Sequence, residues 1–288
     1  MVLLWHRWLS QKYLWLPTIT LIPLLYLLGW IISLPISVAL VLPGELSRLA
    51  GTLISFALLL TVLPSWVCQR WQTPHPWQAL GLRDPQSTFY AVQRLLRGLT
   101  WSVLLLLCVI VPLLLGGWAL WLGDLSGAEI FDAVLLFFIV GWAEELLFRG
   151  WLLGELVLLL GLRGGGFAQA VIFSLAHAQL NAGVIEVVPL LLGLFMLGLA
   201  LLQRRQLDHG SLWGCIGLHG GLVGGWFVVE MGLLQLSPSS PSFLIGPSIT
   251  AINPAGSLTG LICLTVLLKI QRTALAKAPL PSNGAWSA

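Results

Sequence analysis

The segment GWAEELLFRGW (141–151) carries three charges within six positions of an otherwise apolar stretch. Glu145 and Arg149 are four residues apart, so on a helix they share a face and can form an ion pair. Glu144 points about 100° away from Glu145. A carboxylate at mid-membrane costs roughly 2.5–3.5 kcal/mol, and adjacent acids repel each other. The spacing therefore predicts that Arg149 neutralises Glu145 and that Glu144 is available for proton chemistry. If the cluster only stabilised the fold, the free-energy cost of placing the Glu144 carboxylate in the membrane would be unexplained.

Two histidines lie in other apolar segments. His177 ends FSLAH (173–177), where Phe173 lies one turn earlier on the same face. His219 lies in GCIGLHGGLVGGW (214–226), where Gly217, Gly221 and Gly224 form a stripe of small residues. The stripe indicates close packing against another helix, and His219 falls on the opposite face. Taken alone, each histidine could equally be a hydrogen-bonding residue between helices.

Depth in the membrane connects the two histidines to Glu144. At 1.5 Å per residue, all three lie roughly 9–17 Å below the same surface if each occupies a spanning helix. A carboxylate and two imidazoles meeting at one depth can activate a water molecule by general acid–base catalysis. The same three side chains could instead hold a divalent metal such as zinc. We favour the reading that requires no cofactor and assign no metal ligands; Glu144, His177 and His219 would be the ligands if a metal is bound.

The elements that position these groups are membrane helices. The chain is 58% hydrophobic and 9% charged over 288 residues, with a mean hydropathy of +0.94. This composition excludes a soluble domain and extensive disorder. Since a spanning helix needs about 20 mostly apolar residues, we predict an all-α polytopic membrane helix bundle. Its transmembrane helices, about eight in number, are expected at residues 14–42, 47–67, 98–122, 129–150, 166–180, 184–203, 211–234 and 256–270.

The basic residues support this count. With eight spans, every Lys and Arg except Arg48 and Arg149 lies on one side of the membrane. The positive-inside rule makes that side cytoplasmic, so both termini are predicted to be cytoplasmic. The net charge of +3 reflects this loop bias and does not indicate a nucleic-acid partner. The long basic loop at residues 68–98 is expected to lie at the membrane surface.

Three motifs occur in order and at one depth: EELLFR (144–149), FSLAH (173–177) and SLWGCIGLH (211–219). Together they resemble the CPBP intramembrane protease family, which includes the CAAX prenyl endoproteases and the bacterial Abi proteins. The resemblance covers about residues 128–235. It implies an intramembrane endopeptidase with a cavity open to the cytoplasm, in a bacterial cell membrane or internal membrane.

The resemblance also implies a role for each residue. Glu144 would activate the attacking water with help from His177, and His219 would stabilise the oxyanion. Glu145, Arg149 and Phe173 would support the site.

One position departs from the family pattern. The family usually has Asn four residues after the third-motif histidine, as a second oxyanion donor, and here that residue is Val223. Losing such a donor costs on the order of 100–1000-fold in rate. Asn181 could donate instead. The departure keeps a second function open: a weak or inactive member that acts as a membrane scaffold or as a bacteriocin-immunity-type binding protein.

The sequence divides into three expected regions. Residues 1–127 hold the N-terminal transmembrane helices and the cytoplasmic loop, 128–235 the protease core, and 236–288 an uncharged external loop, the last helix and a short cytoplasmic tail. The expected partners are membrane lipid and a peptide or membrane-protein substrate, and the sequence leaves the oligomeric state open. A transporter with Glu144 as a proton relay is a weaker alternative, because no internal repeat is present.

Overall fold

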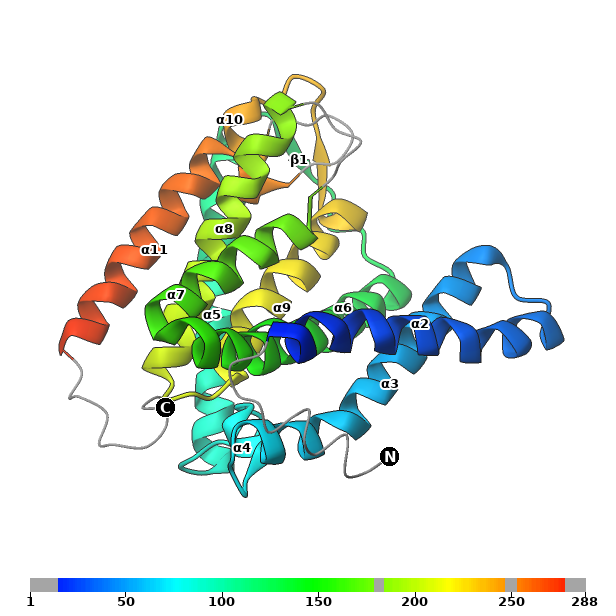
Figure 1. Cartoon of the computed structure of the whole chain (residues 1–288). Helices are drawn as coiled ribbons and strands as arrows, with labels where there is room; N and C mark the ends of the chain where they lie inside the picture. The colour runs from blue at the N-terminus through cyan, green and yellow to red at the C-terminus, as the bar shows by residue number, and fades with distance from the viewer. Residues whose placement is uncertain (1–14, 179–183, 247–252, 278–288) are drawn as a thin grey trace.

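Long apolar helices dominate the residues that the computed structural model describes, which are 15–178, 184–246 and 253–277 (Figure 1). The protein is an all-α polytopic helix bundle, as the composition predicts. Six of the described helices are long and apolar enough to cross a membrane. They are α2 (Trp15–Ala39), α3 (Gly44–Arg70), α5 (Thr88–Leu115), the Val187–Leu207 part of α8 (Val184–Leu207), α9 (Trp213–Val228) together with η2 (Val229–Leu233), and α11 (Leu258–Lys277).

Two predicted spans fall on helices outside this set of six. The fourth corresponds to α6 (Gly127–Glu145) and the short π-helix η1 (Leu146–Leu152), and α6 carries four carboxylates. The fifth lies on α7 (Leu153–Ala176), which is interrupted at Gly161 with φ 72° and ψ 170°. Only glycine adopts that conformation readily. The count of eight spans stays a prediction, and both termini lie outside the described residues.

Short elements complete the fold. α4 (Pro76–Ala79) follows α3, while α10 (Ser242–Ile245) and η3 (Pro254–Gly256) precede α11. β1 (Ala119–Trp121) pairs with β2 (Leu234–Leu236) in an antiparallel ladder at the end of the bundle opposite α4 (Figure 1). This ladder ties the end of α5 to the end of η2.

The glycine stripe of α9 packs as predicted, and α9 lies between α5 and α6. A Cβ at Gly217 would lie 2.1 Å from the Leu95 carbonyl oxygen of α5. A Cβ at Gly220 or Gly224 would lie 2.4 or 2.6 Å from a carbonyl oxygen of α6. The missing side chains therefore let three helix backbones approach closely, and this close packing fixes the helices that carry Glu144 and His219.

We expect Gly217→Ala to lower the thermal stability of the purified protein in detergent. Overpacking costs typically 1–3 kcal/mol, and here the new methyl group meets a backbone carbonyl that cannot rotate away. Alanine regains at most about 1 kcal/mol of helix propensity. Gly127→Ala is the matched control, since no atom lies within 4 Å of a Cβ there. An unchanged unfolding temperature for Gly217→Ala would contradict the packing described here.

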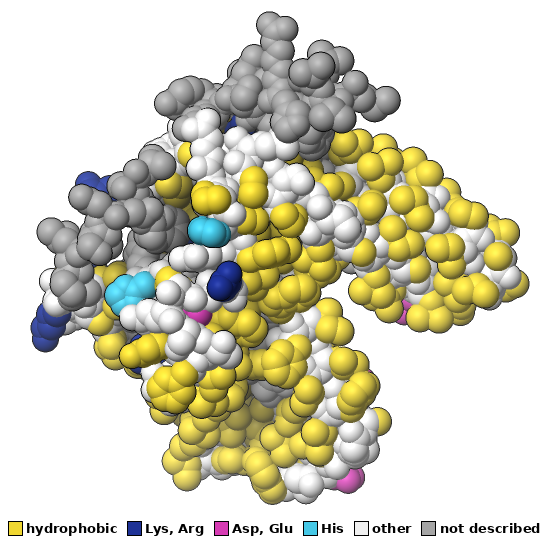
Figure 2. Space-filling view, turned by 90° about the horizontal axis from the view of Figure 1, so that it is seen from below, with side chains coloured by type: hydrophobic (Ala, Val, Ile, Leu, Met, Phe, Trp, Pro, Cys, Tyr) yellow, Lys and Arg dark blue, Asp and Glu magenta, His cyan; other side chains and the backbone are white. Residues whose placement is uncertain are grey.

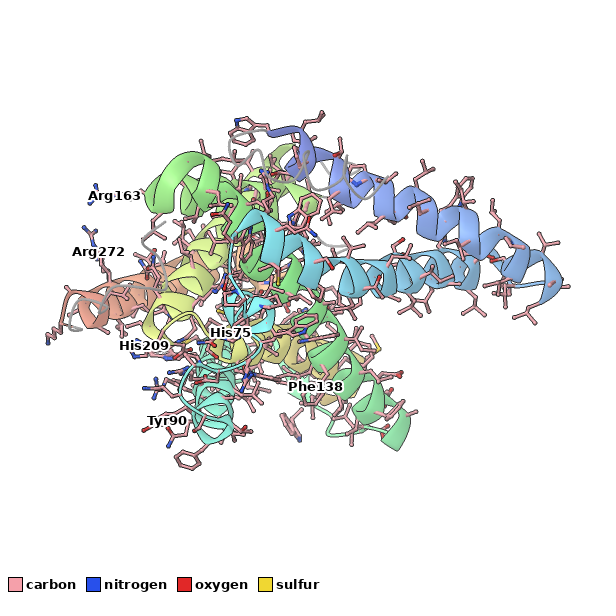
Figure 3. All side chains as sticks on the ribbon, turned by 60° about the horizontal axis from the view of Figure 1, so that its bottom comes forward. His75, Tyr90, Phe138, Arg163, His209 and Arg272 are labelled. Atoms are coloured by element: carbon pink, nitrogen blue, oxygen red, sulfur yellow. The ribbon has the colours of Figure 1, made fainter. Side chains whose placement is uncertain are left out.

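The end of the bundle that carries α4 is also where α8 ends and where α5 and α9 begin (Figure 1). The segments that meet there contain Arg83, Arg94, Arg97, Arg204 and Arg205. Figure 3 brings this end forward and labels Arg163 of α7 and Arg272 of α11 on one side of the view. That these basic residues lie on one side of the membrane stays a prediction.

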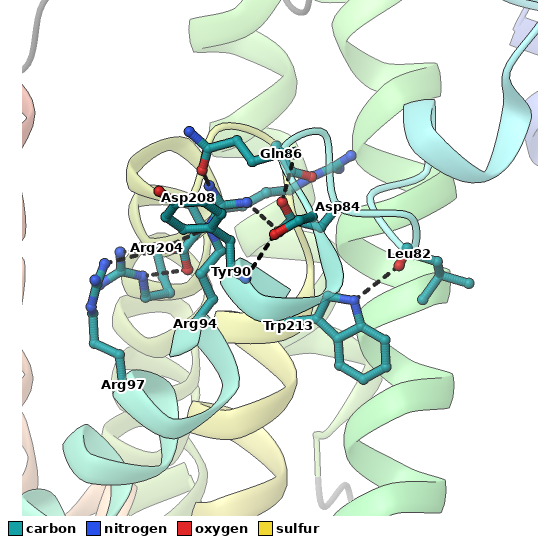
Figure 4. A network of polar contacts seen from close by, with 12 residues as sticks. Leu82, Asp84, Gln86, Tyr90, Arg94, Arg97, Arg204, Asp208 and Trp213 are labelled. Atoms are coloured by element: carbon teal, nitrogen blue, oxygen red, sulfur yellow. Dashed lines mark hydrogen bonds and ion pairs between the residues drawn. The ribbon is translucent and has the colours of Figure 1, made fainter. Parts of the chain in front are cut away.

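A buried polar network holds the loop before α5 against this end (Figure 4). Arg94 of α5 pairs with Asp84 and lies 3.9 Å from Asp208. Arg204 donates two hydrogen bonds to the Asp208 carboxylate, at 2.6 and 2.8 Å. Burial raises the pKa of Asp208 above its ordinary value, although these arginines and Arg97 act to lower it.

The loop at residues 68–98 is attached to the bundle at its middle, and its position at the membrane surface stays a prediction. Leu80 is fully buried, and the Leu82 carbonyl accepts a hydrogen bond from the Trp213 indole at 2.9 Å. The Gly81 carbonyl accepts from the Leu212 amide at 2.8 Å. These contacts attach the loop to the start of α9.

The hairpin of α2 and α3 projects from one side of the bundle (Figure 1), and hydrophobic side chains cover it in the view from below (Figure 2). Two glycines and two serines let its helices pack closely: a Cβ at Gly29 would lie 2.1 Å from Ser55 Oγ, and one at Gly51 would lie 3.3 Å from Ser33 Oγ. An apolar exterior of this kind suits contact with lipid.

Candidate active site

The two adjacent glutamates lie where α6 passes into η1. The Glu144 side chain is 28% exposed, whereas the Glu145 side chain is completely buried. The two carboxylates therefore point to different surroundings, as the helix geometry predicts. Single turns of π-helix inside α-helices occur frequently at functional sites, and here the π-helix begins directly after the pair.

The structure brings Glu144, His177 and His219 together from α6, the end of α7 and α9. The His177 Nε2 atom lies 3.1 Å from the Glu144 Oε2 atom, and the His219 Nε2 atom lies 3.8 Å from the same oxygen. One carboxylate oxygen therefore faces two imidazoles from separate helices. The His177 side chain is 31% exposed and the His219 side chain 6%.

The hydrogen bonds of His177 define how many protons the pair with Glu144 holds. His177 Nδ1 lies 2.8 Å from the Phe173 carbonyl oxygen, which can only accept, so Nδ1 carries a hydrogen. The contact between Nε2 and the Glu144 oxygen then needs a second hydrogen, either on the imidazole or on the carboxyl group. Glu144 and His177 together therefore share one exchangeable proton.

His219 is oriented by Glu145. Its Nδ1 atom lies 2.8 Å from the Glu145 Oε1 atom, which also accepts a hydrogen bond from Arg149 Nη1 at 2.7 Å. The predicted pair of Glu145 and Arg149 is present, and the imidazole is an additional partner that the sequence did not reveal. Because Nδ1 faces the carboxylate, the His219 Nε2 atom is directed toward Glu144, as in other carboxylate-oriented histidines.

The Phe173 ring packs against the imidazoles of His177 and His219. Its ring is fully buried, with its centroid 4.5 Å from that of His177 and 5.6 Å from that of His219. The Arg149 guanidinium carbon lies 3.9 Å from the Phe173 centroid, within the range of a cation–π contact. The three residues predicted to support the site, Glu145, Arg149 and Phe173, therefore all contact it or one another.

A cavity of about 460 Å³ adjoins these groups. Glu144, His177 and His219 line it, and most of the remaining lining is apolar and comes from α5, α6, α8, α9 and α11. Val223, the position where the family carries Asn, also faces this cavity. Asn181, the alternative donor, lies outside the described residues. The cavity runs from Glu144 toward η3 (Pro254–Gly256), away from the basic end, so its opening to the cytoplasm stays a prediction.

The side chains are not arranged as metal ligands. Within residues 15–178, 184–246 and 253–277, no group of three or more His, Cys, Asp or Glu side chains is placed to hold a metal ion. The facing atoms of Glu144 and His177 are instead within hydrogen-bond distance of each other. We therefore derive no step through a metal, and a chelator experiment tests metal dependence directly.

A buried carboxylate that the sequence does not single out follows the EELLFR motif on α7. Glu155 is fully buried on α7 and accepts hydrogen bonds from four side chains of α2, α3 and the residue after α3. The donors are Thr18 Oγ1 at 2.6 Å, Trp66 Nε1 at 2.9 Å, Arg70 Nε at 2.5 Å and Trp71 Nε1 at 2.8 Å. Its signal in the sequence is a single acid inside the apolar run LLGELVLLL (152–160).

Two family models match parts of the chain. Residues 126–224 match the family model described as type II CAAX prenyl endopeptidase Rce1-like. Residues 6–75 match a domain of unknown function, DUF8676. No curated protein and no solved structure matches the chain. The first match spans α6, η1, α7, α8 and most of α9, which are the elements that carry Glu144, His177 and His219. Over residues 126–224, about a third of its length, the chain is therefore similar to the CAAX-type protease family.

Proposed function

We propose that the protein is an intramembrane endopeptidase in which Glu144 activates the attacking water. The observation that carries the proposal is the Glu144 oxygen that faces His177 and His219 beside an apolar cavity. An apolar cavity suits a peptide segment that is itself apolar. The family match over residues 126–224 supports protease chemistry and supports residues 128–235 as the catalytic core.

Proton transfers within the pair of Glu144 and His177 balance over one turnover. The pair starts with one shared proton, held as carboxylate and imidazolium. Water gives a proton to Glu144 while its oxygen attacks the peptide carbonyl carbon. When the C–N bond breaks, the leaving nitrogen takes the proton of His177. The pair then again holds one proton, now on Glu144, so its proton count is restored.

His219 would stabilise the oxyanion of the tetrahedral intermediate. Its Nδ1 hydrogen is directed to Glu145, so Nε2 can donate to an oxyanion only when the ring is an imidazolium. A donor held in place before the reaction is worth about 100–1000-fold in rate.

A cleavage assay with purified protein tests this function. A library of apolar peptides is incubated with the protein in lipid nanodiscs, with and without a chelator, and cleavage sites are read by mass spectrometry. The proposal predicts discrete internal cleavage that persists in chelator. Cleavage abolished by chelator and restored by zinc would replace the metal-free mechanism, and absence of any cleavage would remove the endopeptidase.

Val223 supports a second candidate, a weak or non-catalytic member that acts as a membrane scaffold or as a bacteriocin-immunity-type binding protein. Valine in the cavity cannot donate a hydrogen bond to an oxyanion.

We expect Val223→Asn to raise kcat/KM by roughly 10–100-fold, because it returns a donor to the site. Val223→Leu is the control for altered packing and should not raise the rate. If Val223→Asn leaves a weak wild-type rate unchanged, the missing donor does not limit catalysis.

A further inference from the structure

Glu230 lies on the lining of the cavity, away from the candidate catalytic groups along α9 and η2. Trp226, one turn earlier, and Phe227 line the same region. Glu230 itself is exposed. The cavity thus holds a carboxylate and aromatic rings in a part remote from His219. The mechanism proposed above uses none of these three side chains.

None of the described residues that line the cavity is a Lys or Arg, so no basic side chain on the lining neutralises Glu230. In the described part of the chain, Glu230 forms no ion pair with a basic residue. The start of α6 adds two more acids at this end, Glu129 and Asp132. The local charge is therefore negative and unmatched.

A carboxylate beside an indole is a suitable receptor for a cation. The carboxylate accepts charge-assisted hydrogen bonds from an ammonium or guanidinium group, and the face of Trp is the aromatic surface that attracts cations best. An apolar cavity with such a site at one end selects a ligand that is apolar along its length and cationic near one position.

We propose that Glu230 and Trp226 form a substrate subsite for a Lys or Arg side chain. The inference rests on the endopeptidase function proposed above and specifies its substrate class: an apolar peptide segment with a basic residue at a set distance from the cleaved bond. Eleven helical positions separate His219 from Glu230, which is roughly 16 Å at 1.5 Å per residue. An extended peptide covers that distance in about five residues, so the basic residue lies about four or five positions from the cleaved bond.

The subsite is tested with matched peptides. Each is an apolar 12-residue peptide with one variable position, filled by Lys, norleucine or Glu and moved stepwise from two to seven residues away from the cleaved bond. We expect wild-type protein to cleave the Lys peptide roughly tenfold faster than the norleucine peptide at the favoured distance. Glu230→Gln should reduce this ratio to about two while leaving cleavage of the norleucine peptide unchanged, and Glu230→Lys should favour the Glu peptide.

Asp132→Asn is the matched control for Glu230→Gln. It removes one negative charge from the same end of the bundle, and Asp132 does not line the cavity. A local subsite predicts that Asp132→Asn keeps the full preference for Lys. If both variants lose the preference equally, recognition comes from the overall negative field, and the proposal is overturned. It is also overturned if Glu230→Gln retains the tenfold ratio.

A binding measurement tests the subsite independently of the proposed endopeptidase activity. Fluorescent Lys and norleucine peptides are titrated against Glu144→Gln and against the double variant Glu144→Gln, Glu230→Gln, neither of which needs to cleave them. The subsite predicts roughly tenfold tighter binding of the Lys peptide to the single variant only. If wild-type protein cleaves no peptide but this difference in binding is present, the endopeptidase fails and the subsite stands. Equal binding of both peptides to the single variant rejects the subsite.

Discussion

Glu144→Gln is expected to lower kcat/KM for peptide hydrolysis by about 1000-fold or more. Removing a general base costs typically 100–10,000-fold, and the neutral amide also loses the negative charge that pairs with His177 and lies near His219. The measurement is initial-rate kinetics on purified protein. The variant should remain folded, because the Glu144 side chain is partly exposed and Gln is almost the same size.

The matched control is the same substitution at the neighbouring acid. Glu145→Gln removes a fully buried charge that holds both Arg149 and His219, and breaking a buried pair costs about 3–5 kcal/mol. It should therefore lower the unfolding temperature as well as the rate, whereas Glu144→Gln lowers the rate alone. If Glu144→Gln keeps more than a tenth of the wild-type rate, Glu144 is not the base.

Glu155→Ala is expected to lower the free energy of unfolding by about 3–5 kcal/mol. The substitution takes the carboxylate away from the fully buried Arg70 guanidinium, and removing one partner of a buried ion pair has this cost. The indoles of Trp66 and Trp71 lose their acceptor at the same time. The measurement is chemical or thermal unfolding in detergent, followed by tryptophan fluorescence.

An exposed ion pair in the same hairpin provides the control. Glu45 and Arg48 lie 3.4 Å apart with side chains 90% and 74% exposed, and surface pairs contribute about 0–1 kcal/mol. Glu45→Ala should therefore leave unfolding almost unchanged. All four donors to Glu155 lie within residues 6–75, the segment that matches DUF8676, so Glu155→Ala should also make that hairpin more sensitive to protease. Equal stability of Glu155→Ala and Glu45→Ala would contradict a stabilising role of the Glu155 hydrogen bonds.

Much of the fold could be predicted from the sequence because the length of apolar segments and the distribution of charge largely determine how a chain crosses a membrane. Apolar length predicts the spanning helices, and loop charge predicts which helix ends lie together. The stripe of Gly217, Gly221 and Gly224 predicts the close packing of α9. The rise per residue then predicts that Glu144, His177 and His219 share a depth, which is where the structure brings them together.

Other features depend on packing that no local pattern encodes. The strands β1 (ALW) and β2 (LQL) are three residues each, which is too short for an alternating pattern to be recognised in an apolar chain. α7 is interrupted at Gly161 and resumes directly afterwards, although GLRGGG (161–166) is rich in glycine, which disfavours a helix. The contact between Glu145 and His219 joins residues 74 positions apart, and only the placement of α9 against α6 reveals it.

A single turnover in water labelled with oxygen-18 tests the central claim most directly. Wild-type protein in excess cleaves one peptide in labelled water, and both the product and the protein are analysed by mass spectrometry. If Glu144 delivers water to the peptide carbonyl, one labelled oxygen enters the new carboxyl group of the product and none enters Glu144. Label in the Glu144 carboxylate, or an intact peptide after prolonged incubation, would contradict the account.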